Sequence, residues 1–255
     1  MGEIVESYVE TGRLRVDSIP KNLAKSMIEK YHYTHAWTSC RYAIGLFYET
    51  DNEHAFFDEQ EEKLIGVAVY GYPVGRLSAQ SISELLEPSA VLELTRLFVH
   101  DGYGKNIESH FISKSFKWLQ ENDKKIKALM SYADPKEGHL GGIYQATNWL
   151  YQGDKIRYCD SWLFRLEEDG DWIHPRTIFS QYGTNDINVL KEKIGHTFWM
   201  KEEPRKHRYI YFLCNKKEKK KFIKSLKHPP LKYPDINSLK QIEVKRIDIE
   251  DKFYE

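Results

Sequence analysis

The chain has 255 residues, of which 41% are hydrophobic and 30% are charged, and its formal net charge is zero. This is a globular composition with enough apolar residues for a core. The three cysteines lie far apart, which excludes a C-x-x-C zinc pattern and argues against a disulfide framework. The first 16 residues lack the apolar region of a signal peptide, and no apolar run reaches the roughly 18 residues of a membrane helix. We therefore expect a cytoplasmic protein without a membrane partner.

The predicted elements alternate between strands and helices along the chain. In chain order we expect a strand at 12–16, a helix after Pro20, strands at 41–48, 64–70 and 92–99, a helix at about 105–122, a strand at 126–132, a short helix at 141–150, strands at 156–165 and 207–214, and a basic helix at 216–226. Such an order predicts an α/β (α+β) fold with a mixed central sheet flanked by helices. We expect residues 1–215 to form the main domain and residues 216–255 to be a basic helix and tail packed on it.

The segment 92–132 has the length of a right-handed βαβ crossover. Ligands of such sheets bind at the carboxyl ends of the strands. Residues 99–104 and 132–139 should therefore lie side by side at one mouth of the sheet.

Positive charge gathers near the end of the chain. Residues 201–232 contain 12 Lys and Arg against 3 Asp and Glu, an excess that could bind a polyanion or could simply be a solvated helix face. If the partner is nucleic acid, the phosphate contacts should come from Lys216, Lys217, Lys219, Lys220 and Lys221. The aromatic content is also high, with 17 Tyr and 6 Trp, which fits either an aromatic core rim or a surface that stacks planar ligands.

Two histidines stand between aromatic residues at the end of the first predicted helix. His32 and His35 could supply a general base next to the stacking surface of Tyr33, because histidine titrates near neutrality. The alternative is that both histidines only cap the helix C-terminus. A metal site made of His32, His35 and His139 is a weaker possibility, since no H-E-x-x-H pattern is present and we expect no metal.

A second group of polar residues follows the predicted strand 126–132. Asp134 stands at the strand end with Tyr132 and His139 close in sequence, a position from which a carboxylate can accept a proton or orient a histidine. The alternative is an Asp-Pro turn that only begins a loop.

Glycines and hydrogen-bonding side chains come next in the sequence. Gly141-Gly142 would let the backbone approach a ligand closely. Tyr144 and Asn148 are four residues apart, so we expect them on one helical face, where both can hydrogen-bond a base or an amide.

Arg96 is expected on the central strand, on the same face as Leu92 and Leu94. A buried charge needs a partner, so Arg96 should bind a ligand anion or pair with Asp134 or Glu93. Gly102 and Gly104 precede a predicted helix, whose N-terminal amides could hold a phosphate.

The element order resembles the GNAT acyltransferase fold, and several motifs resemble the phage Mom family of adenine-modifying proteins. These motifs are YHYTHAWTSC (31–40), LIGVAVYGYPVGR (64–76), ELTRLFV (93–99), SYADPKEGHLGGIYQATNWLYQG (131–153) and KHRYIYFL (206–213). The block at 131–153 is the longest and most distinctive, and the resemblance covers most of residues 20–215.

The resemblance implies a transferase that places a carbamoylmethyl group on adenine N6 and so protects phage DNA from restriction in the host cytoplasm. It implies a duplex DNA substrate with a flipped adenine, and a site formed by His32, Tyr33, Arg96, Ser131, Asp134, Tyr144 and Asn148. In this interpretation His32, Tyr33, Arg96, Ser131 and Asp134 are catalytic, while Tyr132, His35, His139, Tyr144 and Asn148 bind the substrate.

The donor is open between acetyl-CoA and an aminoacyl-tRNA. The added group has the atoms of one glycine residue, and an acetyl group alone lacks the nitrogen. Residues 100–108 also lack the Q/R-x-x-G-x-G/A loop that acetyl-CoA-dependent GNAT enzymes usually carry. A glycyl-tRNA would supply every atom.

Three alternative functions remain at this stage. The chain could be a GNAT enzyme that acylates a small molecule or a protein amine, a non-catalytic DNA-binding protein, or a metal-dependent enzyme that uses the histidines.

Overall fold

The computed structural model describes residues 14–50, 61–74, 77–154, 162–202, 205–235 and 244–248. The chain forms two compact units. The first contains residues 1–132, 141–153 and 208–232, and the second contains residues 133–140, 154–207 and 233–255. These divisions differ from the expected boundary at residue 215, because residues 162–202 build a core of their own while the helix after residue 215 belongs to the first unit.

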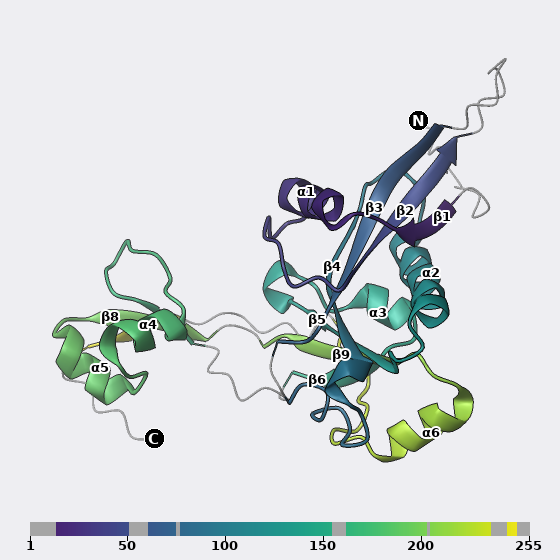
Figure 1. The fold of residues 1–255 in the computed structure, drawn as a ribbon. Coiled ribbons are helices and arrows are strands. Elements are labelled where there is room, and N and C mark those ends of the chain that lie inside the picture. The colour runs from purple at the N-terminus through teal and green to yellow at the C-terminus, as the bar shows by residue number, and fades with distance from the viewer. Residues whose placement is uncertain are drawn as a thin grey trace. The chain divides into compact units, whose positions relative to one another are not determined.

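A seven-stranded sheet forms the centre of the first unit (Figure 1). Its strands, in their order across the sheet, are β1 (Leu14–Ser18), β2 (Tyr42–Thr50), β3 (Glu61–Gly71), β4 (Val91–Val99), β5 (Ala128–Ala133), β9 (His207–Phe212) and β6 (Leu150–Gly153). The helices that accompany it are α1 (Lys21–Tyr31), α2 (Ile107–Asn122), α3 (Gly142–Ala146) and α6 (Lys216–Lys224). β1 to β4 are antiparallel neighbours, whereas β4 and β5 are parallel and are joined through α2. This topology confirms the mixed central sheet with flanking helices expected from the sequence.

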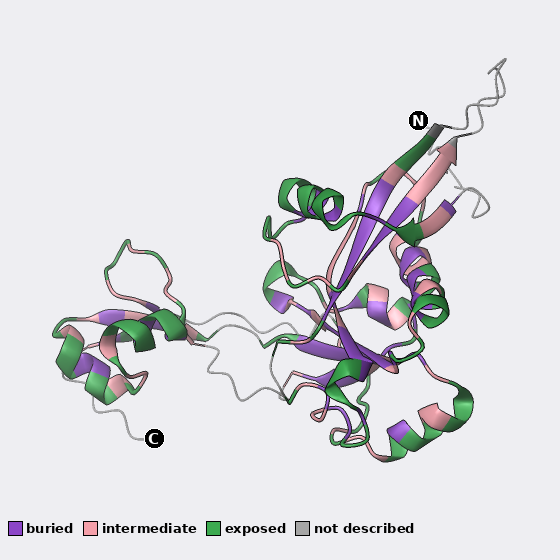
Figure 2. Ribbon diagram, in the orientation of Figure 1, coloured by how far each residue is buried: buried purple, intermediate pink, exposed green. Residues whose placement is uncertain are grey.

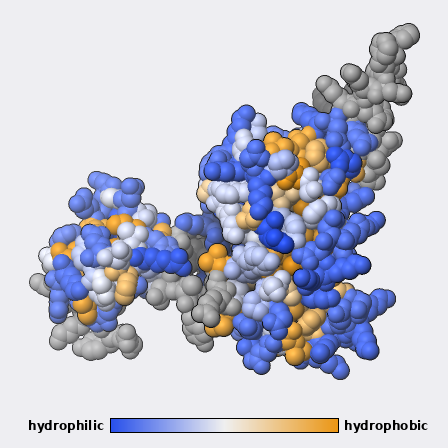
Figure 3. Space-filling model, viewed as in Figure 1, coloured by the Kyte–Doolittle hydropathy of each residue, from blue (hydrophilic) through white to orange (hydrophobic). Residues whose placement is uncertain are grey.

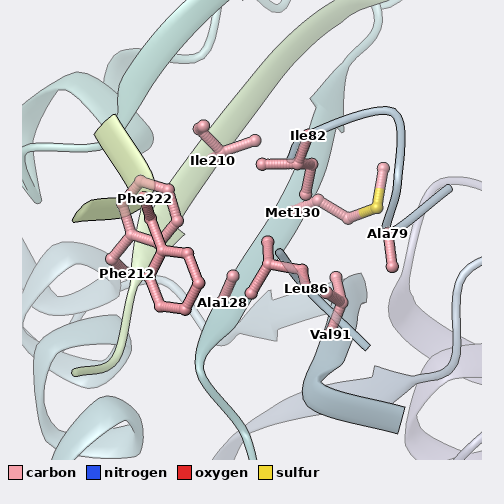
Figure 4. Close-up of a cluster of buried hydrophobic side chains, with 9 residues drawn as sticks. All are labelled: Ala79, Ile82, Leu86, Val91, Ala128, Met130, Ile210, Phe212 and Phe222. Carbon is pink, nitrogen blue, oxygen red and sulfur yellow. The ribbon is translucent and has the colours of Figure 1, made fainter. Parts of the chain in front are cut away.

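The apolar pattern of the chain explains how the helices cover this sheet. The predicted stripe of α1 buries Ala24, Met27 and Ile28, which pack with Val67 and Val69 of β3. In Figure 2 the central strands are buried along much of their length, while the helices keep exposed outer faces. A second cluster joins the segment 79–86 to β5, β9 and α6 (Figure 4). Phe222 anchors α6 there by stacking on Phe212, with ring centroids 5.5 Å apart.

Two irregularities shape the middle of the sheet. β4 and β5 pair only from Val91 and Ala128 to Glu93 and Met130, so the ladder ends before either strand does. The register between β3 and β4 also shifts, because Thr95 is inserted as a bulge between Leu94 and Arg96. The inserted residue interrupts the strict alternation on which the expected face of Arg96 was based.

The second unit contains a three-stranded antiparallel sheet in the order β10 (Val244–Ile247), β8 (Phe198–Glu202) and β7 (Trp162–Arg165). Helices α4 (Pro175–Tyr182) and α5 (Ile187–Ile194) accompany it (Figure 1). β7 occupies the end of the strand predicted at 156–165, and residues 155–161 lie outside the described residues. The sequence pattern did not indicate α4, α5, β8 or β10. No helix among the described residues is long and apolar enough to cross a membrane.

Candidate active site

A buried hydrogen-bonded chain marks the point where β4 and β5 separate. The Ser131 hydroxyl of β5, only 1% exposed, donates to the carbonyl oxygen of Leu94 on β4 at 2.8 Å. The Tyr144 hydroxyl of α3 lies 2.7 Å from the same Ser131 oxygen. A side chain therefore bridges the two strands just beyond the end of their backbone ladder, and it ties α3 to this place.

The direction of each hydrogen bond in this buried series follows from which groups can donate and which can only accept. Ser131 has one hydroxyl proton, and the Leu94 carbonyl can only accept, so the Tyr144 hydroxyl must donate to Ser131. Burial raises the pKa of Tyr144 to about 12. Tyr144 is therefore protonated at neutral pH, and its oxygen keeps lone pairs that can accept a hydrogen bond from a ligand.

Tyr33 and Arg96 belong to the same neighbourhood. Tyr33, 51% exposed, stacks on His32 with ring centroids 4.3 Å apart. Burial lowers the pKa of Arg96, and the nearby Tyr33 and Glu93 partly oppose this shift. Tyr33 also raises the pKa of Tyr144, which places the Tyr33 phenol within electrostatic range of both groups. Tyr33 thus lies near both Arg96 and Tyr144, and Tyr144 is hydrogen-bonded to Ser131.

Arg96 is held by main-chain oxygens. Its Nε donates to the Ala36 carbonyl at 3.1 Å and its Nη1 to the Thr95 carbonyl at 2.7 Å. These bonds tie the segment after α1 to β4. Asp134 and Glu93 were the alternative acidic partners expected for Arg96. In the structure the Oδ2 atom of Asp134 pairs with Lys206 Nζ at 2.8 Å within the second unit, while Glu93 acts on the pKa of Arg96.

His32 is buried and its ring is held in one orientation. The Thr34 amide donates to His32 Nδ1 at 3.1 Å, so the Nδ1 lone pair is occupied and the proton of the neutral ring is on Nε2. In this arrangement His32 Nε2 is a donor. His35 is exposed, and its Nδ1 lies 3.0 Å from the Glu29 carbonyl near the end of α1. That contact matches the alternative in which His35 caps the helix.

The remaining predicted residues make different local contacts. Asn148 does not share a helical face with Tyr144: α3 ends at Ala146, and Asn148 is exposed in a left-handed turn with φ 59° that leads into β6. The chain must reverse there, and Asn tolerates this conformation better than most residues. Tyr132 is partly buried against the core cluster of Figure 4. Asp134 and His139 belong to the second unit, where Asp134 also accepts from the Lys136 amide at 3.1 Å.

Gly141 and β9 support α3 in a way that the motifs only partly indicated. Gly141 has φ +79° and lies against the ring of Tyr209, which fits the expected close approach of the backbone, although what approaches is a tyrosine ring. Tyr209 in turn packs on Tyr144 with ring centroids 5.0 Å apart.

Arg208 was missed by sequence reasoning. It is 2% exposed, and its guanidinium donates to Gln152 Oε1 and to both the hydroxyl and the carbonyl of Ser81. The sequence did contain a signal for it, because a charged residue in the apolar strand KHRYIYFL needs a buried partner, as Arg96 does.

The basic helix lies on the first unit, and its lysines point outward in most cases. Lys216, Lys217, Lys220 and Lys221 are exposed, while the ammonium of Lys219 lies 5.6 Å from the ring centre of Tyr211. Figure 3 shows mainly hydrophilic side chains over α6 on the side of the molecule it draws.

The two glycines before α2, Gly102 and Gly104, both have positive φ. Among the described residues, no group of three or more His, Cys, Asp or Glu side chains is arranged to hold a metal ion.

Comparisons with known proteins agree with the resemblance seen in the motifs. The model of the Mom protein family matches residues 13–235. The chain is 27% identical over 227 residues to a protein of Escherichia phage Mu named methylcarbamoylase Mom, and the match covers 87% of this chain and 83% of the phage protein. Among solved structures, it is similar to the ribosomal-protein-S5-alanine acetyltransferase of Vibrio fischeri, with 14% identity, a TM-score of 0.37 and coverage of 59% and 87% of the two chains. It is also similar to aminoglycoside acetyltransferase AAC(6')-Ib in complex with coenzyme A and kanamycin, with 11% identity, a TM-score of 0.35 and coverage of 67% and 99%.

Proposed function

We propose that this chain, which belongs to the Mom protein family, is a transferase that places a carbamoylmethyl group on N6 of adenine in DNA. The name of the phage Mu relative, methylcarbamoylase, supports the chemistry. Such a modification would protect phage DNA from restriction nucleases in the bacterial cytoplasm. The observation that carries the proposal is the hydrogen-bonded chain from Tyr144 through Ser131 to Leu94, which leaves an acceptor oxygen on Tyr144 within electrostatic range of Tyr33.

An acceptor at this position suits the amino group of adenine. The exocyclic N6 of adenine carries two hydrogens and donates hydrogen bonds. Because the Tyr144 hydroxyl donates its hydrogen bond to Ser131, the Tyr144 oxygen is available to accept a hydrogen bond from N6 and to orient it. We assign Tyr144 to substrate positioning and Ser131 to holding Tyr144 in that state.

Tyr33 provides the stacking surface for the base. Its ring is half exposed and rests on His32, so one side is supported by the protein. A base in duplex DNA must leave the helix to react, and flipped bases commonly stack on aromatic side chains. The exposed lysines of α6 would bind the phosphates without reading sequence.

The added group has the atoms of one glycine residue, which favours a glycyl donor such as glycyl-tRNA. In the first step N6 attacks the glycyl ester carbon, an amide forms, and the tRNA hydroxyl leaves. In the second step the glycyl amine attacks C6, and the original C6–N6 bond breaks. The glycyl nitrogen becomes the new N6, and the former N6 becomes the nitrogen of the carboxamide, so all atoms are accounted for.

The first step needs a proton acceptor and a stabilised oxyanion. Arg96 is the candidate for the oxyanion, because its Nε and Nη1 atoms are fixed by main-chain oxygens and its charge is partly buried. With His32 Nδ1 occupied, His32 is better suited to donate from Nε2 than to accept a proton. Of the two residues that the sequence predicted as proton acceptor, His32 and Asp134, we therefore propose Asp134.

Mass spectrometry of nucleosides tests the proposal directly. The protein is expressed in bacteria, total DNA is digested, and strains with the parent, Tyr144→Phe, His32→Gln and Asp134→Asn proteins are compared. We expect a deoxyadenosine heavier by one glycine residue from the parent, and a loss of about tenfold or more for Tyr144→Phe and Asp134→Asn. Unmodified DNA in the presence of soluble, folded parent protein and charged glycyl-tRNA would contradict the proposal.

The donor is tested with isotopes. Glycine labelled with ¹⁵N should place its nitrogen on N6 of the modified base, and acetate carbon should not enter it. Label from acetyl-CoA in the product would overturn the glycyl route. Label on a small amine or protein, with the DNA unmodified, would instead favour an acyltransferase of the ordinary GNAT type.

A further inference from the structure

The sheet of the second unit carries an alternating row of indole and guanidinium groups. Arg165 of β7 pairs in register with Trp199 of β8, which pairs in register with Arg246 of β10. On the other side of β7, Ile173 forms a bridge with Phe164, which brings Trp172 next to Arg165. The row across the sheet is therefore Trp172, Arg165, Trp199 and Arg246. Residues directly opposite in neighbouring strands share a face, so the row lies on one face of the sheet.

The other face of the sheet is the core side of this unit. Phe164, Phe198 and Met200 are buried there and pack with Ile178 of α4 and Leu190 of α5. Since successive residues of a strand point to opposite faces, Arg165 and Trp199 point away from these helices. Trp172, Arg165 and Trp199 are partly exposed, and Arg246 is exposed. Packing of the hydrophobic core accounts for the side chains on the helix side of the sheet, but it does not account for the row of tryptophans and arginines on the other face.

The guanidinium of Arg165 lies over the rings of both indoles. Its Cζ atom lies 5.1 Å from the ring centre of Trp172 and 5.0 Å from that of Trp199. Lys201 adds a second cation, with Nζ 4.2 Å from the ring centre of Trp172. Aromatic faces attract cations, so the stack fixes the position of the charge without neutralising it.

The charge of Arg165 is not met by a carboxylate within the part of the chain that the structure describes. Its buried Nε also has no hydrogen-bond partner there. A buried donor without a partner is uncommon and costs stability unless a ligand completes it. Arg246, by comparison, is paired with Asp248 at 3.1 Å. The unmatched positive charge is thus centred on Arg165, between two aromatic rings.

We propose that this face of β7, β8 and β10 binds single-stranded DNA, with Arg165 on a phosphate and the indoles of Trp172 and Trp199 against bases or sugars. Positive groups that follow the backbone, interleaved with aromatic rings, are the combination that proteins use for single strands without sequence preference. The charge complementarity is with a polyanion, and the partly exposed indoles favour unpaired bases over a closed duplex. The surface is distinct from the Tyr144 cluster of the first unit and requires none of its residues.

The test is a binding experiment on the full chain with a DNA that cannot be modified. Fluorescence anisotropy is followed with a labelled oligothymidylate of about 16 nucleotides, the upper site size of one binding surface of this kind. Oligothymidylate contains no adenine, so binding and modification are separated: failure here leaves the proposed transferase untouched, and a failed transferase leaves this result standing.

Arg165→Gln should weaken oligothymidylate binding about tenfold, the loss expected for one charge-assisted contact. It should also reduce the slope of log Kd against log salt concentration by about 0.7, the value for one phosphate of a single strand. Arg176→Gln is the matched control. Arg176 is an exposed arginine on α4 of the same unit, and its replacement removes the same charge. Circular dichroism and thermal unfolding confirm that the variants are folded.

Three further variants keep the test decisive if Arg165→Gln does not fold. Lys201→Gln should weaken binding in the same direction, and Trp199→Phe, which keeps a ring, should bind better than Trp199→Leu. Equal binding by Arg165→Gln and Arg176→Gln, or by Lys201→Gln and the parent, would overturn the proposal. Preference of the parent for oligouridylate RNA over oligothymidylate by about tenfold or more would overturn the assignment to DNA.

Discussion

Gly141 lies so close to Tyr209 that a β-carbon added to it would come within 2.5 Å of the ring atom Cε2. Its φ of +79° is also a conformation that residues with a side chain rarely adopt. We predict that Gly141→Ala lowers the free energy of unfolding by about 2–4 kcal/mol, because backbone strain and overpacking add. Urea unfolding followed by fluorescence measures the loss.

The neighbouring Gly142 offers a matched control. A β-carbon on it would meet no atom within 4 Å, and the residue begins the helix α3. Gly142→Ala should leave stability unchanged or raise it by up to about 1 kcal/mol through better helix propensity. Equal effects of the two substitutions would contradict the close approach of Gly141 to Tyr209.

Alkaline pH should weaken the fold through Tyr144. Burial raises the folded-state pKa of Tyr144 to about 12 from the ordinary 10. The stabilising effect is therefore complete below pH 10 and is lost as the pH rises through 12, where the unfolded chain ionises more readily. For two pKa units the loss is on the order of 2–3 kcal/mol.

Unfolding measured between pH 9 and about 11 checks this expectation, since tyrosines ionise near pH 10. Tyr144→Phe should show a smaller loss of stability across that range than the parent chain. Tyr72→Phe serves as the control, because Tyr72 is 43% exposed and carries little burial cost. If Tyr144→Phe and Tyr72→Phe lose stability in parallel, the buried phenol is not responsible.

Arg208 should tolerate no conservative replacement. Its planar guanidinium reaches Gln152 and Ser81 through three different nitrogens, a geometry that the single ammonium of lysine cannot reproduce. We predict that Arg208→Lys costs about 2–4 kcal/mol, since it leaves buried acceptors without donors. Arg205→Lys, at an exposed position nearby in sequence, should change the thermal midpoint little. Similar midpoints for the two variants would count against the buried network.

The charge of α6 should govern the salt dependence of duplex binding. Replacement of Lys216, Lys217, Lys220 and Lys221 by Gln removes exposed charges while Phe222 continues to anchor the helix. We expect weaker binding to duplex DNA and a loss of about 0.9 in the slope of log Kd against log salt for each phosphate contact removed. Replacement of Lys114, Lys117, Lys124 and Lys125, exposed on or just after α2, is the control. Identical slopes for the two sets would exclude a specific role of α6.

The sequence predicted most of the central sheet because its strands have simple apolar patterns and its helices have regular stripes, as α1 and α6 show. It assigned Ser131 and Tyr144 to one site, since both belong to one distinctive motif, but it did not indicate the hydrogen bond between them. It could not predict the surroundings of Arg96, because the bulge at Thr95 is one inserted residue that periodicity does not reveal. The expected helical face of Tyr144 and Asn148 was wrong because α3 stops at Ala146. In the second unit α4, α5, β8 and β10 were missed, because short amphipathic segments such as α4 and β8 carry little periodic signal.

The division of the chain between its two units limits how the protein can be truncated or divided into fragments. The boundaries fall after Tyr132, Leu140, Gly153, His207 and Lys232, so the backbone passes from one unit to the other five times. No single stop codon or start site can therefore yield either unit alone. Removal of the second unit would require three separate deletions. Any truncated fragment that keeps one unit complete also carries pieces of the other, so inactivity in such a fragment would say nothing about which unit holds the chemistry.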